Sequence, residues 1–257
     1  GENTKNILHQ FGADKTILDL IKSGRFDNIS IAAHTRWASV GAVSQENVHP
    51  LVNLKSTTNQ IPTILSFVNG DIYNYKEIYN KMIWGEKIDY NFNKNSDSIA
   101  LSYLFSEKGS FSSVAGIRRQ LKNIVGSITS IVLSDEHPSK VLLIKKGNQG
   151  LFLGKNDDRI FFASDAYGLV DDCDRVYNLD EECFGILNLE SMELGLKLNG
   201  INSNTEKRIQ YTDYDKVIIT SRDVSKKSFK HYLIKEIYET GDIVESTLRK
   251  YINQEVT

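Results

Sequence analysis

The chain has 257 residues and a mass of 29.1 kDa, with 31 lysines and arginines against 33 aspartates and glutamates. Its 40% hydrophobic and 25% charged residues are typical of a globular protein and exclude disorder as the main state. A net charge of −2 offers no basic excess to neutralise phosphates, so we expect no nucleic-acid partner. The longest apolar stretches fall far short of the ~20 residues that cross a bilayer, so we expect no membrane partner either.

The two cysteines, Cys173 and Cys183, are too few for a disulfide framework or a zinc knuckle, and they predict a reducing, cytoplasmic environment. The five histidines show no metal-ligand spacing, and no glycine-rich phosphate loop is present. We therefore expect neither a metal ion nor a cofactor. The sequence opens with Gly1-Glu2-Asn3 instead of methionine, without the pattern of a secretory signal.

The first quarter of the chain predicts a helix followed by two strands. Residues 14–25 have apolar side chains at helical spacing, with Asp14 as the cap. Ile29–Ala33 is typical of a short, buried strand. Ile61–Val68 is apolar almost throughout, which predicts a strand covered on both faces, and Asn69-Gly70-Asp71 predicts the turn that ends it.

The middle of the chain changes from helices to short strands. Asp97–Ser106 and Ser113–Ile124 are predicted helices. Tight polar turns join several of the strands that follow, and such turns produce antiparallel neighbours. The predicted strands are Ser127–Leu133, Val141–Lys145, Leu151–Gly154, Ile160–Ser164 and Cys183–Leu189. Ala166–Val170 predicts one helical turn between them.

The end of the chain predicts a polar connection over residues 200–230 and a helix over Tyr232–Tyr251. One face of that helix is apolar and consists of Leu233, Ile237, Val244, Leu248 and Tyr251. Helices and strands in this order, with antiparallel strands, predict an α+β protein built in layers.

Three short segments carry candidate functional groups. Arg36 follows the first predicted strand and either holds a carboxylate through its two-pronged guanidinium or stacks on Trp37 as an edge arginine. The amide of Asn69 and the N–H of Gly70 can stabilise an oxyanion, where each donor is worth ~3–4 kcal/mol, although Asn-Gly is also a common turn. Asp97 at a helix start is either a cap or a ligand contact.

The residues alone reveal no nucleophile. No serine lies in a GxSxG turn, and no basic neighbours are arranged to lower the thiol pKa of Cys173 or Cys183. We interpret both cysteines as structural.

Five stretches, taken together, resemble the class II glutamine amidotransferase domain, in particular the glutaminase half of the glutamine–fructose-6-phosphate aminotransferases. They are AHTRWASVGAVSQENVHPL, FVNGDIYNY, NSDS, LFLGKNDDRIFFASD and FKHYLIKEIYE, in the order of the family, and the resemblance covers nearly the whole chain, from about residue 7 to residue 251. The resemblance implies an N-terminal-nucleophile (Ntn) hydrolase-like fold, a four-layer αββα sandwich of two antiparallel sheets.

The resemblance also implies a glutamine site. Arg36 would bind the α-carboxylate of L-glutamine and Asp97 its α-ammonium, while Asn69 and Gly70 would hold the oxyanion. Trp37 occupies the place of the aromatic residue that closes the ammonia passage. Where the family has HTRWATHG this chain has HTRWASVG, so Ser39 replaces a threonine and Val40 a histidine.

The resemblance further implies a longer protein. The family's nucleophile is an N-terminal cysteine, which Gly1 does not replace, so we expect residues 1–230 to be an amidotransferase domain without its nucleophile segment. Residues 231–257 would be a helix leading toward an absent sugar isomerase domain. By the same resemblance the full-length protein is a homo-oligomer.

The expected activity is hydrolysis of L-glutamine to glutamate and ammonia for the amination of a keto-sugar phosphate, fructose 6-phosphate to glucosamine 6-phosphate. The sugar phosphate would bind in the missing isomerase domain or in a partner, and the 257 residues alone would be inactive. The alternative is a non-catalytic glutamine-binding or scaffold module that lacks the nucleophile. A different acceptor also stays open, because Val40 and residues 56–60 depart from the family pattern.

Overall fold

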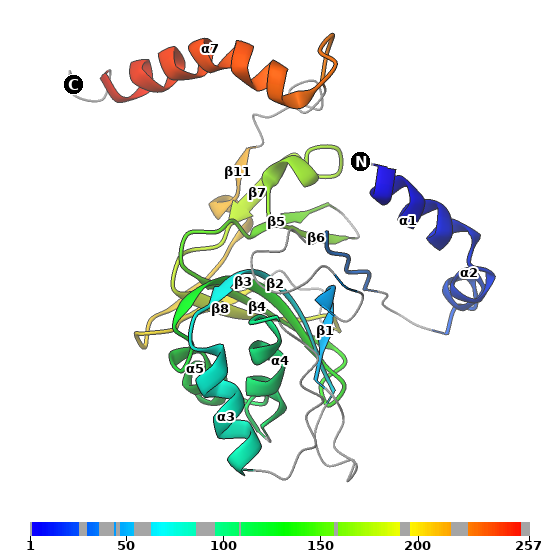
Figure 1. The fold of residues 1–257 in the computed structure, drawn as a ribbon, viewed down its shortest axis with the longest axis vertical. Coiled ribbons are helices and arrows are strands. Elements are labelled where there is room, and N and C mark those ends of the chain that lie inside the picture. The colour runs from blue at the N-terminus through cyan, green and yellow to red at the C-terminus, as the bar shows by residue number, and fades with distance from the viewer. Residues whose placement is uncertain are drawn as a thin grey trace. The chain divides into compact units, whose positions relative to one another are not determined.

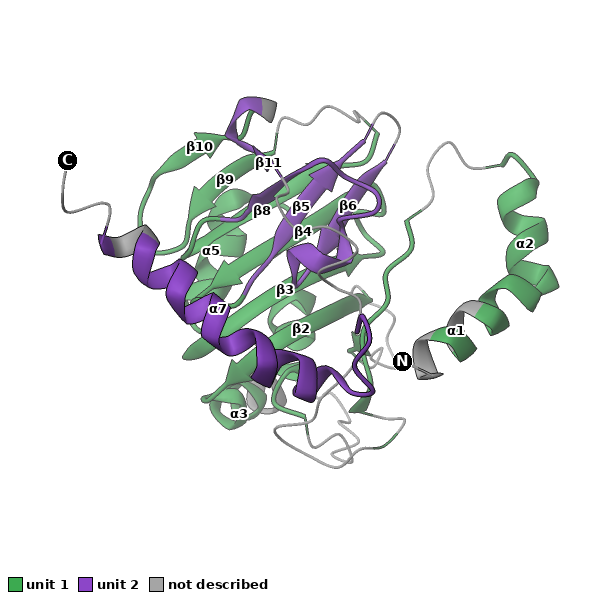
Figure 2. Cartoon of the chain, turned by 90° about the horizontal axis from the view of Figure 1, so that it is seen from above, with its two compact units in different colours: residues 1–149, 180–211 green, residues 150–179, 212–257 purple. Residues whose placement is uncertain are grey.

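The structure is a computed structural model, and the chain in it divides into two compact units (Figure 2). The larger unit contains residues 1–149 and 180–211, and the smaller one contains residues 150–179 and 212–257. The residues that the structure describes are 2–25, 30–35, 44, 47–53, 63–85, 96–107, 109–156, 159–190, 196–216 and 226–252.

The larger unit is built on a seven-stranded antiparallel sheet with the order β1-β2-β3-β4-β8-β9-β10. Its strands are β1 (Leu51–Val52), β2 (Ile64–Ile72), β3 (Gly126–Ser134), β4 (Lys140–Lys146), β8 (Cys183–Asn188), β9 (Lys197–Gly200) and β10 (Glu206–Arg208). Its helices are α1 (Glu2–Ala13), α2 (Lys15–Lys22), α3 (Tyr75–Gly85), α4 (Ile99–Ser106) and α5 (Val114–Lys122). Figure 1 shows α3, α4 and α5 on one face of this sheet.

The core of the larger unit lies between that sheet face and the helices. Val68, Ile144 and Phe184 belong to one row across β2, β4 and β8, and all three are buried. Every residue of α4 is buried, so this helix needs polar partners for its hydroxyls. Ser102 of α4 donates to Leu51 O at 2.9 Å and lies 2.7 Å from Ser66 Oγ, which fixes the helix against β1 and β2.

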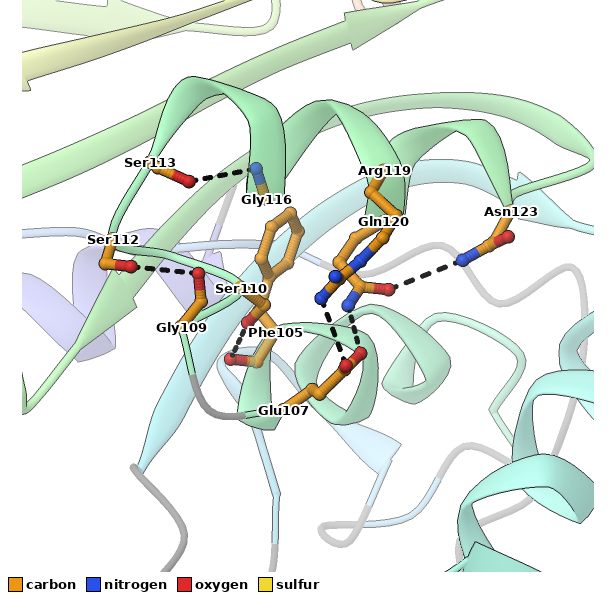
Figure 3. A network of polar contacts seen from close by, with 10 residues as sticks. All are labelled: Phe105, Glu107, Gly109, Ser110, Ser112, Ser113, Gly116, Arg119, Gln120 and Asn123. Atoms are coloured by element: carbon orange, nitrogen blue, oxygen red, sulfur yellow. Dashed lines mark hydrogen bonds and ion pairs between the residues drawn. The ribbon is translucent and has the colours of Figure 1, made fainter.

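The connection from α4 to α5 is closed by a polar network around Glu107 (Figure 3). The Glu107 carboxylate accepts a hydrogen bond from Arg119 at 3.0 Å and another from the side-chain amide of Gln120. A Cβ added at Gly116 would lie 2.7 Å from Gly109 O. Glycine therefore allows this connection to lie close against the first turn of α5.

The smaller unit has a four-stranded antiparallel sheet with the order β11-β7-β5-β6. Its strands are β5 (Phe152–Lys155), β6 (Ile160–Ala163), β7 (Arg175–Asn178) and β11 (Asp215–Lys216). Its helices are the 3-10 helix η2 (Ala166–Gly168) and the α-helix α7 (Tyr232–Ile252). A second 3-10 helix, η3 (Tyr211–Asp213), contains the residue at which the chain passes from one unit to the other. Ala166, Leu169, Cys173 and Val176 form its small core.

Most of the predicted elements are confirmed, and so is the α+β architecture with two antiparallel sheets. Asp14 caps α2 and accepts a hydrogen bond from Ile17 N at 3.1 Å. The two middle helices appear as α4 and α5, the predicted strands as β3, β4, β5, β6 and β8, and the last helix as α7. Helices α1 and α3 and strands β1, β7, β9, β10 and β11 were not predicted, and the last two lie within the segment 200–230 that we expected to be a connection.

The buried strand predicted over Ile29–Ala33 is wrong for the part that the structure describes. Residues 30–33 have no regular secondary structure, and the Ile31 side chain is 68% exposed. An apolar run indicates a strand only where another strand pairs with it, and no described strand pairs with these residues.

The turn predicted at Asn69-Gly70-Asp71 is also wrong. Strand β2 continues through these residues to Ile72, with Gly70 opposite Ile128 of β3. Gly70 has φ +127°, and a Cβ there would lie 2.0 Å from Ser127 O. Glycine is required here because the two strands approach closely at this position. A close approach and a turn both favour glycine, so the Asn-Gly dipeptide does not distinguish between them.

Helix α7 keeps its apolar face exposed. Leu233 is 67% exposed, Ile237 63% and Leu248 54%. Within the described residues, none of the helices combines the length and the apolar composition that crossing a membrane requires.

Candidate functional site

The candidate site lies at the Gly70 end of the edge of β2 that faces away from β3. In an antiparallel strand successive N–H groups point to alternate edges. Tyr73 N–H donates to Val125 O beyond the start of β3, so the odd-numbered residues of β2 point toward β3 and the even-numbered ones point away. Side chains accept three of the even-numbered N–H groups: Asn53 Oδ1 from Ile64 (2.6 Å), His49 Nδ1 from Val68 (2.9 Å) and Asp97 Oδ2 from Ile72 (2.7 Å).

The N–H of Gly70 points to this same edge, between the N–H groups of Val68 and Ile72. We find no side-chain acceptor for it among the described residues. A backbone N–H that is directed outward and has no side-chain partner is the kind of donor an oxyanion requires. Gly70 is only partly buried, which leaves it accessible to a ligand.

Asn69 lies beside this donor, and its side chain is exposed. It is opposite Thr129 of β3, and Thr129 is opposite Lys145 of β4. Residues in register project from the same face of a sheet, so these three side chains leave the face away from the core of the larger unit. Thr129 and Lys145 are buried, and Asn69 is the exposed end of the row.

Asp97 is positioned by the turn that leads into α4. Its side chain is 4% exposed, and Oδ1 accepts a longer hydrogen bond from Ser98 Oγ at 3.4 Å. Tyr79 donates its hydroxyl to Ser96 O at 2.9 Å and so anchors the residue before Asp97. Burial, together with Tyr103 and Asp97, raises the pKa of Tyr79, so the hydroxyl remains a donor. Ser96 Oγ is buried and has no hydrogen-bond partner in the described part of the chain.

Arg36 and Trp37 lie outside the described residues, as do Ser39 and Val40. The structure therefore places Asp97 and the N–H of Gly70 at one edge of β2 and the Asn69 side chain on the adjoining sheet face, and it describes the chain before Arg36 only as far as Thr35. In that preceding segment His34 stacks on His49, with ring centroids 4.1 Å apart and an interplanar angle of 11°.

The two cysteines have the environment of structural thiols. Cys183 donates its S–H to Asp180 O at 2.9 Å, and burial, with Asp180 nearby, raises its pKa to about 12. Burial raises the pKa of Cys173 to about 11. Both thiols are protonated at neutral pH and are poor nucleophiles. In the described ranges no group of three His, Cys, Asp or Glu side chains is placed to hold a metal ion.

Sequence reasoning missed the contact of His49 with β2, and it missed the structural contact of Asn53 at the far end of the same strand. Neither residue belongs to a periodic pattern, and a side chain that accepts an N–H from a distant strand leaves no local signal. His49-Pro50 is part of the stretch that carries the family resemblance, and this was the one signal available for His49.

The model of the glutamine amidotransferase domain family matches residues 18–195. Two similar curated proteins are the glutamine–fructose-6-phosphate aminotransferases (isomerizing) of Chlorobaculum tepidum, 27% identical over 227 residues, and Chlamydia caviae, 28% identical over 228 residues. These alignments cover 87% and 86% of this chain and 34% of each relative, so the chain spans about a third of the relatives' length.

Two solved structures share the fold. Glutamine phosphoribosylpyrophosphate amidotransferase from B. subtilis has a TM-score of 0.50, and a structure described as the allosteric regulatory enzyme of purine biosynthesis has 0.51. Both are 21% identical to this chain and cover 66% of it, while the matches span 34% and 35% of those chains. The chain belongs to the glutamine amidotransferase domain family.

Proposed function

We propose that this domain binds L-glutamine at the open edge of β2 and, in the full-length protein, hydrolyses it to glutamate and ammonia. The observation that carries this proposal is the placement of Gly70 and Asp97: the outward N–H of Gly70 lies two residues along β2 from the N–H that the buried Asp97 carboxylate accepts. Two residues of a strand span ~7 Å, which an extended glutamine bridges from its α-ammonium to its side-chain amide.

In this proposal each end of the zwitterion has its own partner. Asp97 pairs with the α-ammonium, and Arg36 grips the α-carboxylate with its two-pronged guanidinium. The reacting amide then lies beside the Asn69 side chain and the Gly70 N–H, which hold the oxyanion of the tetrahedral intermediate. Trp37 closes the passage through which ammonia leaves.

The nucleophile comes from outside these 257 residues. In the family it is an N-terminal cysteine whose own α-amine takes the thiol proton. The thiolate adds to the amide carbon, and the C–N bond breaks as the protonated α-amine of the cysteine passes its proton to the departing nitrogen, which leaves as ammonia. Water then hydrolyses the glutamyl thioester to glutamate and frees the thiol. Because burial raises the pKa of both Cys173 and Cys183, neither can replace that cysteine, and the chain alone is inactive.

The acceptor of the ammonia is a keto-sugar phosphate, with fructose 6-phosphate converted to glucosamine 6-phosphate. Support comes from the curated relatives, which are named for that substrate. The chain spans about a third of their length, so we further propose that the helix of residues 231–257 leads toward a sugar isomerase domain. The full-length protein would be a cytoplasmic homo-oligomer.

The test is steady-state kinetics of glutamate release by the full-length protein. Asn69→Ala should lower kcat by ~100-fold or more with little change in KM, because an oxyanion donor acts in the transition state. Arg36→Lys should raise KM strongly, because a point charge does not reproduce the bidentate grip. Asn80→Ala on the exposed face of α3 is the matched control and should leave both constants unchanged.

An unchanged kcat in Asn69→Ala would refute the oxyanion assignment. A second candidate, a glutamine-binding module without turnover, is favoured by one observation: neither cysteine of the chain has the environment of a nucleophile. Calorimetry on the full-length protein separates the two, since glutamine binding without release of glutamate would support the module.

A further inference from the structure

The stacked pair His34 and His49 connects strand β2, which carries Gly70, to the segment that precedes Arg36 in the chain. His49 contacts β2 through its ring nitrogen, and His34 belongs to the segment that precedes Arg36. Neither histidine has a role in the mechanism above.

The side chain of His49 extends the hydrogen bonding along β2 beyond the point where the backbone of β1 stops pairing with it. The backbone of β1 pairs with β2 at Leu51, opposite Ser66, and goes no further toward Gly70. One step nearer to Gly70 on the same edge, Val68 N–H donates to His49 Nδ1 at 2.9 Å. An imidazole nitrogen that accepts a hydrogen bond carries no proton, so His49 is the tautomer protonated on Nε2.

This hydrogen bond flanks the proposed oxyanion donor on one side. Asp97 accepts from Ile72 at 2.7 Å on the other side. Gly70 N–H is thus held between two side-chain hydrogen bonds, each two residues away along the strand. A donor that must lie within tenths of an ångström of a developing oxyanion needs such support from both directions.

We propose that His49 is a positioning residue with two separable functions. Its Nδ1 acceptor holds β2 so that the Gly70 N–H points at the substrate amide, and its ring face, stacked on His34, aligns the segment that carries Arg36. The inference rests on the proposed function.

Two substitutions separate these functions in the full-length protein. His49→Phe keeps a flat ring for His34 but removes the acceptor, so kcat should fall by ~100-fold with KM little changed, as for a misplaced catalytic group. His49→Asn keeps an acceptor near the position of Nδ1 but removes the ring, so kcat should stay within a few-fold of wild type while KM for glutamine rises. His34→Ala should repeat the effect of His49→Asn.

Asn53→Ala provides the structural control. Asn53 accepts the Ile64 N–H at the far end of the same edge, six residues from Gly70. Its loss should lower the melting temperature without changing either kinetic constant. If His49→Phe and His49→Asn change kcat and KM in the same way, or leave both unchanged, His49 is merely structural and the proposal is overturned.

A spectroscopic measurement decides the matter where a variant fails to fold. In ¹⁵N-histidine-labelled wild-type protein the His49 signals should show a proton on Nε2 and none on Nδ1, and a proton on Nδ1 would overturn the proposal. Together with glutamine binding and glutamate release by the wild type, this spectrum separates the two hypotheses. A wild-type protein that neither binds nor hydrolyses glutamine refutes the proposed function, whereas an active wild type with the wrong tautomer refutes only the role of His49.

Discussion

The two edges of β2 are held in different ways. Toward β3, nine consecutive residues of β2 pair in register with nine of β3, backbone to backbone. On the opposite edge, β1 pairs with only two residues, and beyond it the side chains of Asn53, His49 and Asp97 accept the strand's N–H groups.

The difference shows where this domain can place chemistry. A backbone ladder uses groups that every residue except proline carries, so it depends little on side-chain identity. An edge completed by side chains depends on particular residues, and it leaves a chosen N–H available between them. The proposed oxyanion donor, the N–H of Gly70, lies at the edge that side chains complete. There it is both accessible to a ligand and held in position by the hydrogen bonds on either side.

The largest expected effect is that of Gly70→Ala, which disrupts the backbone pairing of β2 with β3. The new Cβ would lie 2.0 Å from Ser127 O, and φ +127° is strained for any residue with a side chain. We expect a loss of at least ~3 kcal/mol in the free energy of unfolding, measured by urea denaturation. Gly241→Ala is the control: Gly241 lies in α7 with no atom within 4 Å of its Cβ position, and alanine there should stabilise by about 0.5–1 kcal/mol.

The next effect in size concerns Asp97 and separates its two functions. Asp97→Ala leaves the Ile72 N–H without its acceptor and should cost about 2–3 kcal/mol of unfolding free energy. Asp97→Asn retains an oxygen acceptor and should stay within about 1 kcal/mol of wild type, yet glutamine affinity by calorimetry should fall by about 10-fold or more because the charge is gone. Equal glutamine affinities for wild type and Asp97→Asn would remove Asp97 from the site.

A smaller effect is expected from Asn53→Ala, which removes a side-chain acceptor far from Gly70. The Asn53 side chain is buried and accepts the Ile64 N–H at 2.6 Å, so its loss should cost about 1–2 kcal/mol of unfolding free energy. A change of kcat in a folded Asn53→Ala variant would show that the whole edge, and not only the part next to Gly70, controls the donor.

The smallest effect is expected from Cys183, which belongs to the row of paired residues that begins at Asn69. Burial raises its pKa to about 12, whereas an unfolded thiol ionises at about 8.5. The fold favours the neutral thiol, so its contribution is complete below the lower value and is lost as pH rises toward the higher one. Denaturation at about pH 7 and pH 10 should show a smaller alkaline loss in Cys183→Ala than in wild type, with glutamate release unchanged.

The elements that could be predicted are those with strong local signals. Helix α5 begins with Ser113, whose side chain accepts from Gly116 N–H at 3.0 Å, and its apolar residues repeat at helical spacing. Strands β3 and β4 contain apolar segments with β-branched residues, at positions 131–133 and 141–144. By contrast, β9, β10 and β11 are short and polar and are strands only because a neighbour pairs with them, which no local pattern reveals.

The same distinction holds for the candidate site. Asn69, Gly70 and Asp97 were predicted from short motifs and a family resemblance, but Asn69-Gly70 was expected to form a turn. The structure places the pair inside β2, where the close approach of Ser127 from β3 leaves no room for a side chain at position 70. His49 and Asn53 could not be predicted, because their partners, Val68 and Ile64, are 19 and 11 residues away.

The sequence by itself determined the family, the α+β class, the Asp14 cap of α2 and the chemical types of the candidate residues, because these depend on motifs and on neighbours within a few positions. Only the tertiary structure decided which outward N–H groups of β2 have a side-chain acceptor and which one is left for a ligand. That choice depends on side chains brought from other parts of the chain to one strand edge, and their distance in space is not encoded by their spacing in sequence.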